Sequence, residues 1–408
     1  MKLLFAWRYF RAKKSTNAIN IISWVSMTAI VVGSAALILV LSVFNGFEGL
    51  VKSLYSSFYP DMKISPLTGK TLTLTPDQLQ RLTTVKGIKA FSLIAEDKAI
   101  LENDSARWAA YLKGVDRNFT KVSGVGEHVE KGTFDLGTED HPLAILGSGV
   151  EYALHLESDR ALLPVGVYIF KKGNGVDYTS DPTMSLSHES MGIAGRFRIQ
   201  QDFDDNYVIT NMAFVKRMLG LQPNEYSGVE LSVNDSTQTE LVRQQLVQIL
   251  GKNYRIQTRY EQNQNLYGVM GAEKWFIYIM LTMILIVAAF NMVGALTMLV
   301  WEKQKDIHVL KALGASNGLI QKIFLSEGIL LGVMGGVAGM LLALVTCLLQ
   351  IKYKLIPLQG DSFLIDYYPV KLVPTDFLLV LSTILVVALL ASWIPARKAA
   401  AQPIELKS

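Results

Sequence analysis

Four long runs without a charged side chain stand out in the pattern of hydrophobic and polar positions. They cover residues 15–47, 275–301, 328–350 and 377–396, and they are 33, 27, 23 and 20 residues long. A helix needs about 20 mainly apolar residues to cross a bilayer, so each run is long enough. The pattern therefore predicts four transmembrane helices and excludes a soluble cytoplasmic enzyme.

The first run is preceded by residues 1–14, where five basic side chains and no acidic one alternate with aromatic and aliphatic ones. This mixture predicts a short cytoplasmic helix lying in the headgroup layer. An excess of lysine and arginine before the first span places the N-terminus in the cytoplasm. The apolar run is more than twice as long as that of a secretory signal, so we expect an uncleaved anchor.

The other segments follow by alternation across the membrane. We expect transmembrane helices at residues 15–47, 275–301, 323–350 and 377–396. Residues 48–274 and the loop 351–376 then lie outside, whereas the loop 302–322 and the tail 397–408 lie in the cytoplasm. The inner loop and the tail are rich in lysine and arginine, in agreement with this orientation.

The large outer segment shows both kinds of periodicity and predicts an α+β domain. Strand-like runs are residues 72–74, 99–101, 109–112, 165–170, 197–199 and 228–233. Helix-like runs are residues 76–83, 212–219 and 237–250. Residues 171–191 are polar and rich in glycine and serine, and they predict an exposed excursion that is either a functional arm or a flexible loop. The adjacent Asp204 and Asp205 predict a solvated turn.

Composition and charge exclude several classes of function. The net charge is only +4, so nothing predicts a nucleic-acid partner. The single cysteine, Cys347, rules out an internal disulfide and predicts a small packing residue inside the third run. The five histidines are scattered, and we find neither a phosphate-binding loop nor a nucleophile motif. We therefore expect no catalytic residue, no metal and no cofactor on this chain.

The inner loop contains a short amphipathic pattern over residues 302–316. Apolar residues recur at three- and four-residue spacing, acidic residues come early, and Gly314 is placed as a helix stop. Such a helix is suited to a groove on another protein, and the alternative is a helix resting on lipid. The candidate contact residues are Glu302, Lys303, Asp306, Ile307, Leu310, Lys311, Leu313 and Gly314.

The third run carries overlapping GxxxG pairs, at Gly332 and Gly336 and at Gly335 and Gly339. These pairs predict close approach of helices, either within the chain or between two chains. Glu327 stands before the run, where it is a functional candidate or reaches the interface as a snorkelling or capping group.

The first two spans are bulky and rich in methionine and aromatic residues, which adapt to varied apolar partners such as acyl chains. Ordinary packing within the chain or against lipid is the alternative. The candidate cavity residues are Leu37, Val40, Val43, Phe44, Phe47, Tyr278, Met283, Phe290 and Met292.

Several motifs resemble one family. The segment SVFNGFE at residues 42–48 resembles a signature of LolC and LolE, the permeases of the lipoprotein-releasing ABC transporter. Further similarities to the same family lie at residues 7–11, 112–116, 145–147 and 205–207. The inner loop and the C-terminal segment 392–403 resemble the wider FtsX/MacB superfamily. The similarity covers essentially the whole chain. The signature positions are Ser42, Asn45, Gly46, Glu48, Pro395 and Arg397.

The resemblance implies a multi-pass protein of the bacterial inner membrane with a periplasmic domain of two subdomains between helices one and two. It implies a second permease subunit, identical or different, and a separate LolD-like ATPase that holds ATP and Mg²⁺ and docks on the residue 302–316 helix. Lipoproteins would be held by their acyl chains between the first and second spans and passed to a LolA-like carrier. Residues 171–191 occupy the place of the carrier-recruiting hook of LolC. The alternatives are an FtsX-like regulator of cell-wall hydrolases and a MacB-like efflux mechanotransmitter.

Overall fold

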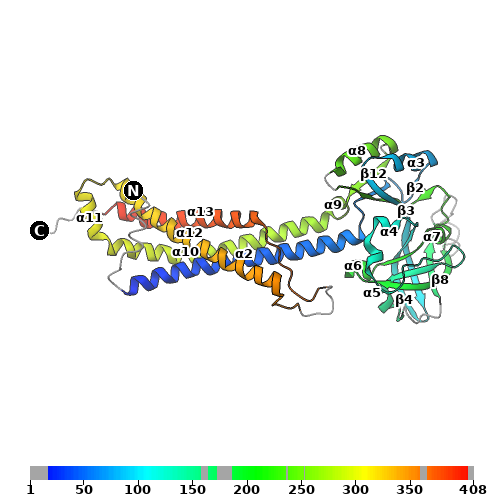
Figure 1. The fold of residues 1–408 in the computed structure, drawn as a ribbon, viewed down its shortest axis with the longest axis horizontal. Helices are drawn as coiled ribbons and strands as arrows, with labels where there is room; N and C mark the ends of the chain where they lie inside the picture. The colour runs from blue at the N-terminus through cyan, green and yellow to red at the C-terminus, as the bar shows by residue number, and fades with distance from the viewer. Residues whose placement is uncertain are drawn as a thin grey trace. The chain divides into compact units, whose positions relative to one another are not determined.

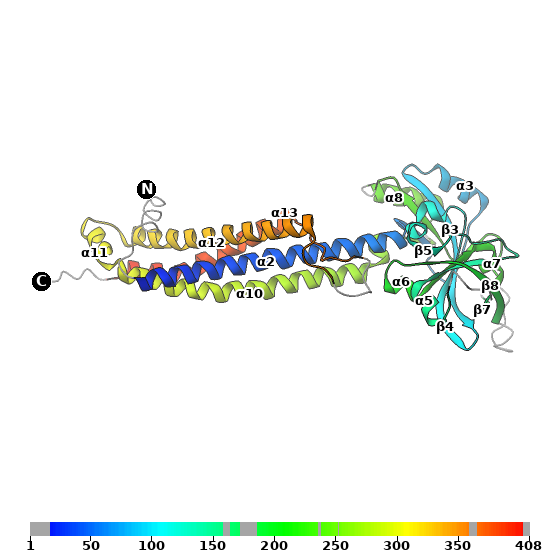
Figure 2. The ribbon, with the colours of Figure 1, turned by 60° about the horizontal axis from the view of Figure 1, so that its bottom comes forward.

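The computed structural model describes residues 17–157, 164–171, 186–235, 238–251, 253–358 and 365–402, with side chains described from residue 24 onward. These residues form two units (Figures 1 and 2). One unit is a bundle of long helices, and the other is an α+β domain that contains residues 51–267. The predicted N-terminal interfacial helix at residues 1–14 and residues 172–185 of the predicted excursion lie outside the described residues.

The membrane unit is built from α2 (Asn17–Phe58), α10 (Gln264–Glu302), α12 (Asn317–Tyr353) and α13 (Pro374–Ala400). The short α11 (Gln304–Ala312) joins α10 to α12. Within the described residues, these are the four helices that are long and apolar enough to cross a membrane. Helix α2 ends at residue 58, beyond the first apolar run, and α10 begins at residue 264, ahead of the second. Both helices are therefore longer than their apolar runs.

Helix α12 packs between α2 and α13 through its glycines. A Cβ atom on Gly339 would lie 2.0 Å from Ser34 Oγ of α2, and one on Gly336 would lie 2.7 Å from Ile384 Cδ1 of α13. Only residues without a side chain permit such close approach of helices. The predicted GxxxG pairs therefore serve packing within the chain.

Two polar or reactive groups are buried in α12. Cys347 is buried as a packing residue, as its place inside the third apolar run predicts. Glu327 is only 2% exposed, so of the alternatives left open by the sequence its burial contradicts a snorkelling carboxyl group. Snorkelling requires a side chain on an open helix face, whereas Glu327 lies beside Gly328, which contacts Ser392 of α13.

The α+β domain alternates strands with short helices. Its strands are β1 (Met62–Pro66), β2 (Leu72–Thr73), β3 (Ile88–Asn103), β4 (Ala106–Val115), β5 (Val129–Gly132), β6 (Leu143–Gly147), β7 (Val165–Phe170), β8 (Leu186–Phe197), β9 (Tyr207–Asn211), β10 (Glu225–Tyr226), β11 (Gly228–Val233) and β12 (Tyr254–Thr258). Its helices are α3 (Pro76–Thr84), α4 (Phe119–Val122), η1 (Gly124–His128), α5 (Ser148–Ala153), α6 (Gln201–Asp204), α7 (Met212–Leu219), α8 (Thr239–Leu250) and α9 (Arg259–Gln262).

Local signals explain where these helices begin and end. The Thr75 hydroxyl and the Gln78 side chain form a capping box at the start of α3, with Pro76 as its first residue. The Asn211 side chain accepts a hydrogen bond from the Ala213 N–H at the start of α7. Gly220 ends α7 in the left-handed conformation that glycine adopts without steric cost.

One mixed sheet of ten strands organises the domain in the order β12-β1-β11-β3-β4-β9-β6-β8-β5, and β7 pairs with both β3 and β8. The long strand β3 links the two halves, because it pairs with β11 through its first part and with β4 and β7 through its second part. Helices α5 and α7 share a buried cluster with the second half, and α3 and α8 share one with the first.

Two expectations for this domain need correction. Residues 186–191 of the predicted polar excursion belong to β8 and pair with β7, because a strand partner can satisfy the backbone of a polar sequence. The strand predicted at 197–199 ends at Phe197.

Asp204 is buried rather than part of a solvated turn, and its carboxylate accepts a hydrogen bond of 2.9 Å from the Ile199 N–H. Burial raises the pKa of this carboxyl group to about 6, although hydrogen bonds from Ile199 and Ser148 oppose the shift.

The sheet also buries charged groups. Lys63 pairs with Glu96 and Lys113 pairs with Glu230, each with an N–O distance of 2.6 Å. The Lys113 and Glu230 side chains are only 2% and 1% exposed. Burial opposes the charge of Lys63, but Glu96 and Glu230 outweigh it and raise the pKa of this amine. We call these four side chains the charge ladder, because they come from the adjacent strands β1, β11, β3 and β4.

Candidate functional site

The first part of the site is a polar cluster on three membrane helices, at the point where the apolar runs of α2, α10 and α13 end. Asn45 of α2 donates a hydrogen bond of 2.6 Å to Asp376 of α13 and accepts one of 2.8 Å from Lys274 of α10. Lys274 also lies 3.3 Å from the Asp376 carboxylate. A buried carboxylate is stable in such a place only when it is paired and hydrogen-bonded, so the cluster holds α2, α10 and α13 together at this level.

The rest of the 42–48 signature holds the segment that leads into α13. The Ser42 carbonyl oxygen accepts a hydrogen bond of 2.9 Å from the Lys371 N–H. A Cβ atom on Gly46 would lie 2.2 Å from the Pro369 carbonyl oxygen, so only glycine permits this approach. The Phe47 ring meets the Tyr368 ring edge to face, with centroids 6.0 Å apart. The signature therefore has a packing role in this structure.

The remaining signature positions differ in exposure. Glu48 is partly buried on α2, whereas Pro395 is buried inside α13 and Arg397 is exposed near its end.

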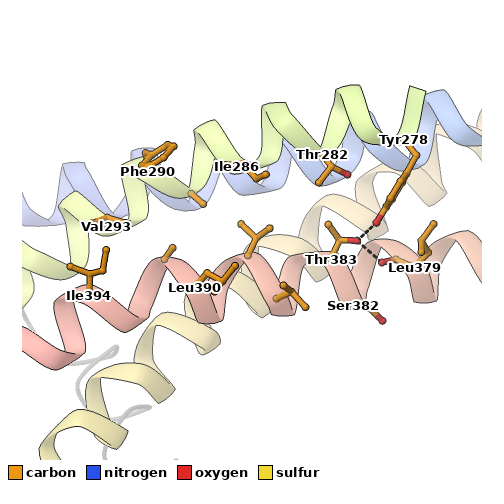
Figure 3. A pocket seen from close by; sticks show the side chains of 14 residues that line it. Tyr278, Thr282, Ile286, Phe290, Val293, Leu379, Ser382, Thr383, Leu390 and Ile394 are labelled. Atoms are coloured by element: carbon orange, nitrogen blue, oxygen red, sulfur yellow. Dashed lines mark hydrogen bonds between the residues drawn. The ribbon is translucent and has the colours of Figure 1, made fainter. Parts of the chain in front are cut away.

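The second part of the site is an apolar groove between α10 and α13, with a volume of about 590 Å³ (Figure 3). Tyr278 and Thr383 share a hydrogen bond, and Thr383 and Ser382 donate to backbone carbonyl oxygens of their own helix. Within the described residues, the Thr282 hydroxyl group has no hydrogen-bond partner. The lining residues are Tyr278, Thr282, Ile286, Ala289, Phe290, Val293, Leu379, Ser382, Thr383, Val386, Val387, Leu390, Ala391 and Ile394.

The groove is long and has a polar mouth. It follows α10 from Tyr278 to Val293, and fifteen helical steps of about 1.5 Å each span about 22 Å. One leaflet of the hydrocarbon core is about 15 Å deep. A second cavity of about 320 Å³ shares Tyr278 and Leu379 with the groove and is also lined by Lys274 and Asp376 of the polar cluster. The arrangement suits a long apolar chain that ends in a polar group.

The predicted cavity residues fall into three sets in the structure. Tyr278 and Phe290 line the groove. Leu37 and Met292 are fully buried in the bundle, so they are not available to a ligand. The other five lie on partly or fully exposed parts of α2 and α10; they are Val40, Val43, Phe44, Phe47 and Met283. Phe44 also lines a further cavity with Phe276 and Ile277. The contribution of α13 had no sequence signal, because its apolar residues give no indication of which helix they face.

The third part of the site is α11, which is fixed to the bundle at two points. Ile307 is buried among residues of α12 and α13. Lys311 donates hydrogen bonds to the carbonyl oxygens of Ala400 and Gln402, which stand at and beyond the end of α13. Gly314 adopts φ +90°, and the Ala315 N–H bonds back to the Leu310 carbonyl oxygen, which closes the helix.

The open face of α11 differs from the predicted one. Leu313 is 80% exposed and Val309 is 59% exposed, so the free apolar face contains these two residues rather than Ile307. Lys303 and Asp306 form an ion pair with a distance of 3.5 Å. Of the other predicted contact residues, Glu302 and Leu310 are partly buried and Gly314 is exposed.

The described residues contain no group of three or more His, Cys, Asp or Glu side chains that could hold a metal ion.

Comparisons with known proteins agree with this architecture. Residues 23–249 match the MacB-like periplasmic core domain, and residues 278–404 match the FtsX-like permease C-terminal region.

Two relatives match almost end to end. The chain is 28% identical to the lipoprotein-releasing system transmembrane protein LolE of Haemophilus influenzae, over 99% of this chain and 98% of that protein. It is 27% identical to the corresponding LolC of Neisseria meningitidis, over 98% of each chain. The predicted fold class, four transmembrane helices with a large α+β domain between the first and second, is confirmed. The chain belongs to the family of inner-membrane permeases with a MacB-like periplasmic core domain and an FtsX-like C-terminal region.

Proposed function

We propose that the chain is a permease subunit of an ABC transporter that releases lipoproteins from the outer leaflet of the inner membrane. ATP would be hydrolysed with Mg²⁺ on a separate subunit, and a periplasmic carrier would receive the lipoprotein. The end-to-end similarity to LolE and LolC supports this function over an FtsX-like regulator or a MacB-like efflux protein. The observation that carries it is the apolar groove between α10 and α13.

The groove has the chemistry that an acyl chain requires. Aliphatic and aromatic side chains line it, and its hydroxyl groups at Tyr278 and Thr383 already bond to each other. A ligand that enters it loses no hydrogen bond to water as long as it is apolar. The Lys274–Asp376 pair at the mouth suits the polar end of a lipidated residue. A lipoprotein therefore fits better than a wholly polar cargo.

Helix α11 has the properties of an ATPase contact. Val309 and Leu313 lie one turn apart on its open face, and exposed apolar residues at this spacing fit a groove on a partner protein. The buried Ile307 and the Lys311 bonds would pass a displacement of α11 to α12 and α13. With α11 on the cytoplasmic side, both termini are cytoplasmic, as the lysine and arginine bias also favours.

A second permease subunit, identical or different, would cover the open face of α2 and α10. On this face, Val32 and Val40 of α2 and Phe276, Met283 and Val287 of α10 are exposed. The chain also requires a periplasmic carrier similar to LolA, but the part of the predicted excursion at residues 172–185 lies outside the described residues.

The first experiment depletes the protein in its native cell and follows lipoproteins in separated inner and outer membranes. Accumulation in the inner membrane supports the proposal. Normal sorting with defective cell separation would contradict it in favour of a regulator of cell-wall hydrolases.

A second experiment tests the groove in that cell. Val293→Trp should fill the groove and reduce release several-fold, because an indole ring occupies the space of the acyl chain. Val345→Trp is the matched control, since Val345 lies on α12, is exposed and does not line the groove. Equal release by both variants, at equal protein levels, would contradict acyl binding in the groove.

A third experiment tests α11 by copurification of the ATPase. Leu313→Glu should abolish copurification because it places a charge in the apolar contact. Leu355→Glu is the control, because Leu355 is exposed at the other end of α12. Full ATPase recovery with Leu313→Glu would show that α11 is not the contact.

A further inference from the structure

The periplasmic domain contains a cavity that the proposed function does not use. It has a volume of about 670 Å³, and all of its lining residues belong to this domain. They come from the end of α2, from β3 and β4, from the turn between α6 and β9, and from residues 261–266. The lining residues are Tyr55, Tyr59, Lys98, Tyr111, Asp202, Phe203, Asn206, Tyr207, Glu261, Gln262, Asn263, Gln264, Asn265 and Leu266.

Aromatic rings form much of this cavity. Tyr111 and Tyr207 stack with centroids 5.2 Å apart, and Tyr59 meets Phe203 at 5.4 Å. Burial raises the pKa of the Tyr59 and Tyr207 hydroxyl groups, so both are neutral at any physiological pH. Within the described residues, the hydroxyl groups of Tyr59, Tyr111 and Tyr207 make no hydrogen bond to another side chain or to the backbone. The rings are therefore fixed while their polar ends remain available.

Amide side chains supply the other hydrogen-bonding groups. Gln262 donates to the carbonyl oxygens of Pro60 and Gln257, but its own Oε1 atom is buried without a partner. The side chains of Gln264 and Asn265 are exposed and make no hydrogen bond to another described residue. The Gln262 Oε1 atom is not reachable from the cavity, so the amides that a ligand can contact are those of Gln264 and Asn265.

The charges and the lining exclude three kinds of ligand. Two carboxylates face one lysine, which disfavours an anion. A cation is also disfavoured, because both carboxylates already have partners: Asp202 accepts a hydrogen bond from Tyr55, and Glu261 pairs with Arg243. In addition, the Lys98 ammonium group lies 5.4 Å from the Tyr111 ring centroid and takes the place of a cation there. Leu266 is the single aliphatic residue of the lining, so a lipid chain has little to contact.

A polypeptide is also disfavoured. Peptides commonly bind either by adding a strand to a free sheet edge or by placing apolar side chains in pockets. The strands that line the cavity, β3, β4 and β9, are paired on both sides, so they offer no edge. The cavity also lacks pockets for apolar side chains, because Leu266 is the single aliphatic residue of its lining.

We propose that this cavity binds a neutral saccharide. A sugar ring presents C–H groups that pack on the electron-rich faces of tyrosine rings, and its hydroxyl groups donate to and accept from amides and phenols. Gln264 and Asn265 provide both donors and acceptors in the lining that holds the rings. This site is independent of lipoprotein release and of the groove between α10 and α13.

The test measures binding of neutral tetrasaccharides to the full chain by isothermal titration calorimetry. The protein is held in nanodiscs prepared without glycoside detergents, because maltoside headgroups are themselves saccharides. The probes are maltotetraose, cellotetraose and chitotetraose, with an uncharged serine- and glycine-rich peptide as the competing class. We expect one of the tetrasaccharides to bind and the peptide not to bind.

Variants connect binding to the cavity. The double variant Gln264→Ala and Asn265→Ala should weaken binding about tenfold, since it removes two hydrogen-bonding groups. Gln244→Ala is the matched control, because Gln244 is an exposed amide of α8 outside the cavity. Tyr111→Phe keeps the ring and should weaken binding less than the double variant does, with Tyr152→Phe, an exposed tyrosine of α5, as its control.

Three results would overturn the proposal. They are the absence of binding by all three tetrasaccharides, binding that the cavity variants leave unchanged, and binding of the peptide in place of the tetrasaccharides with sensitivity to Tyr111→Phe. Loss of lipoprotein release has no bearing on this measurement, so failure here and failure of the proposed function can be told apart.

Discussion

In the membrane unit, the Asn45–Lys274–Asp376 cluster stands where the apolar runs of three helices end, and the groove between α10 and α13 is apolar. The periplasmic domain instead buries the charge ladder inside its sheet, and its cavity is lined by tyrosines and amides. The two cavities have similar volumes, about 590 and 670 Å³, but opposite chemistry.

The difference follows from what surrounds each unit. A helix in a bilayer satisfies its own backbone, so its side chains can be apolar throughout and its ligands are apolar too. A domain in water can bury a charge only where a partner of opposite charge is fixed beside it, and a ten-stranded sheet provides such partners on adjacent strands. The lining chemistry of a cavity, rather than its size, therefore indicates what it holds.

The largest expected effect comes from breaking the charge ladder. Lys113→Met removes the ammonium group that lies 2.6 Å from the buried Glu230 carboxylate and leaves only the attraction of Lys63 from the neighbouring strand. We expect it to destabilise the periplasmic domain by about 3–5 kcal/mol. The double variant Lys113→Met and Glu230→Leu should recover most of this loss. Hydrogen exchange of the β4 and β11 amides measures both.

A matched exposed pair provides the control. Arg107 pairs with Glu102 at 2.7 Å, but the arginine side chain is 70% exposed. Arg107→Met should cost about 1 kcal/mol or less. Equal losses from Lys113→Met and Arg107→Met would show that burial is not what makes the ladder costly to break.

A smaller effect is expected at the polar end of the membrane unit. Gly46→Ala places a Cβ atom against the Pro369 carbonyl oxygen and should destabilise the bundle by about 1–3 kcal/mol. Gly271→Ala is the same change in α10 with nothing within 4 Å, and it should stabilise the helix by about 0.5–1 kcal/mol. Unfolding of the full chain in detergent by denaturant compares the two. The same sign for both variants would contradict a contact role for Gly46.

The smallest effect concerns Asp204. Its pKa is raised to about 6 in the folded domain from an ordinary value of 3.8. The folded state therefore holds this proton more tightly, so the stability contributed by Asp204 is full below about pH 4 and is lost as the pH rises through about 6. Asp204→Asn keeps an acceptor for the Ile199 N–H and should make exchange of the β6 and β9 amides slower than in wild type at pH 7.5. No difference at pH 7.5 would show that Asp204 is not strained when ionised.

Much of the fold could be predicted because its signals are local. The runs at residues 165–170, 212–219 and 228–233 are β7, α7 and β11 with the predicted bounds. The predicted strand at 109–112 is the centre of β4, which extends further at both ends. The bounds of β8 were missed because its first residues are polar and yet form strand hydrogen bonds. Alternation of apolar and polar residues shows which side chains are buried, and it does not show which backbone groups are hydrogen-bonded.

The site was harder to predict because its contacts join distant parts of the chain. Asn45 was identified by family resemblance, but its partners Lys274 and Asp376 are 229 and 331 residues away. Periodicity shows that a span is apolar all round and cannot show which side meets a neighbour. For this reason α13 was left out of the predicted cavity, and Leu37 and Met292 were included although the bundle buries them.

The burial of Cys347 makes the natural chain a ready background for chemical labelling. Because its only thiol is buried in α12, maleimides and spin labels should react slowly with the wild-type protein under native conditions. A cysteine introduced in place of Phe290 in the groove, or of Asn265 in the periplasmic cavity, would then report its own surroundings, and Cys347 would not have to be replaced. The accessibility of each position can then be followed in its own variant while the proposed ATPase partner turns over.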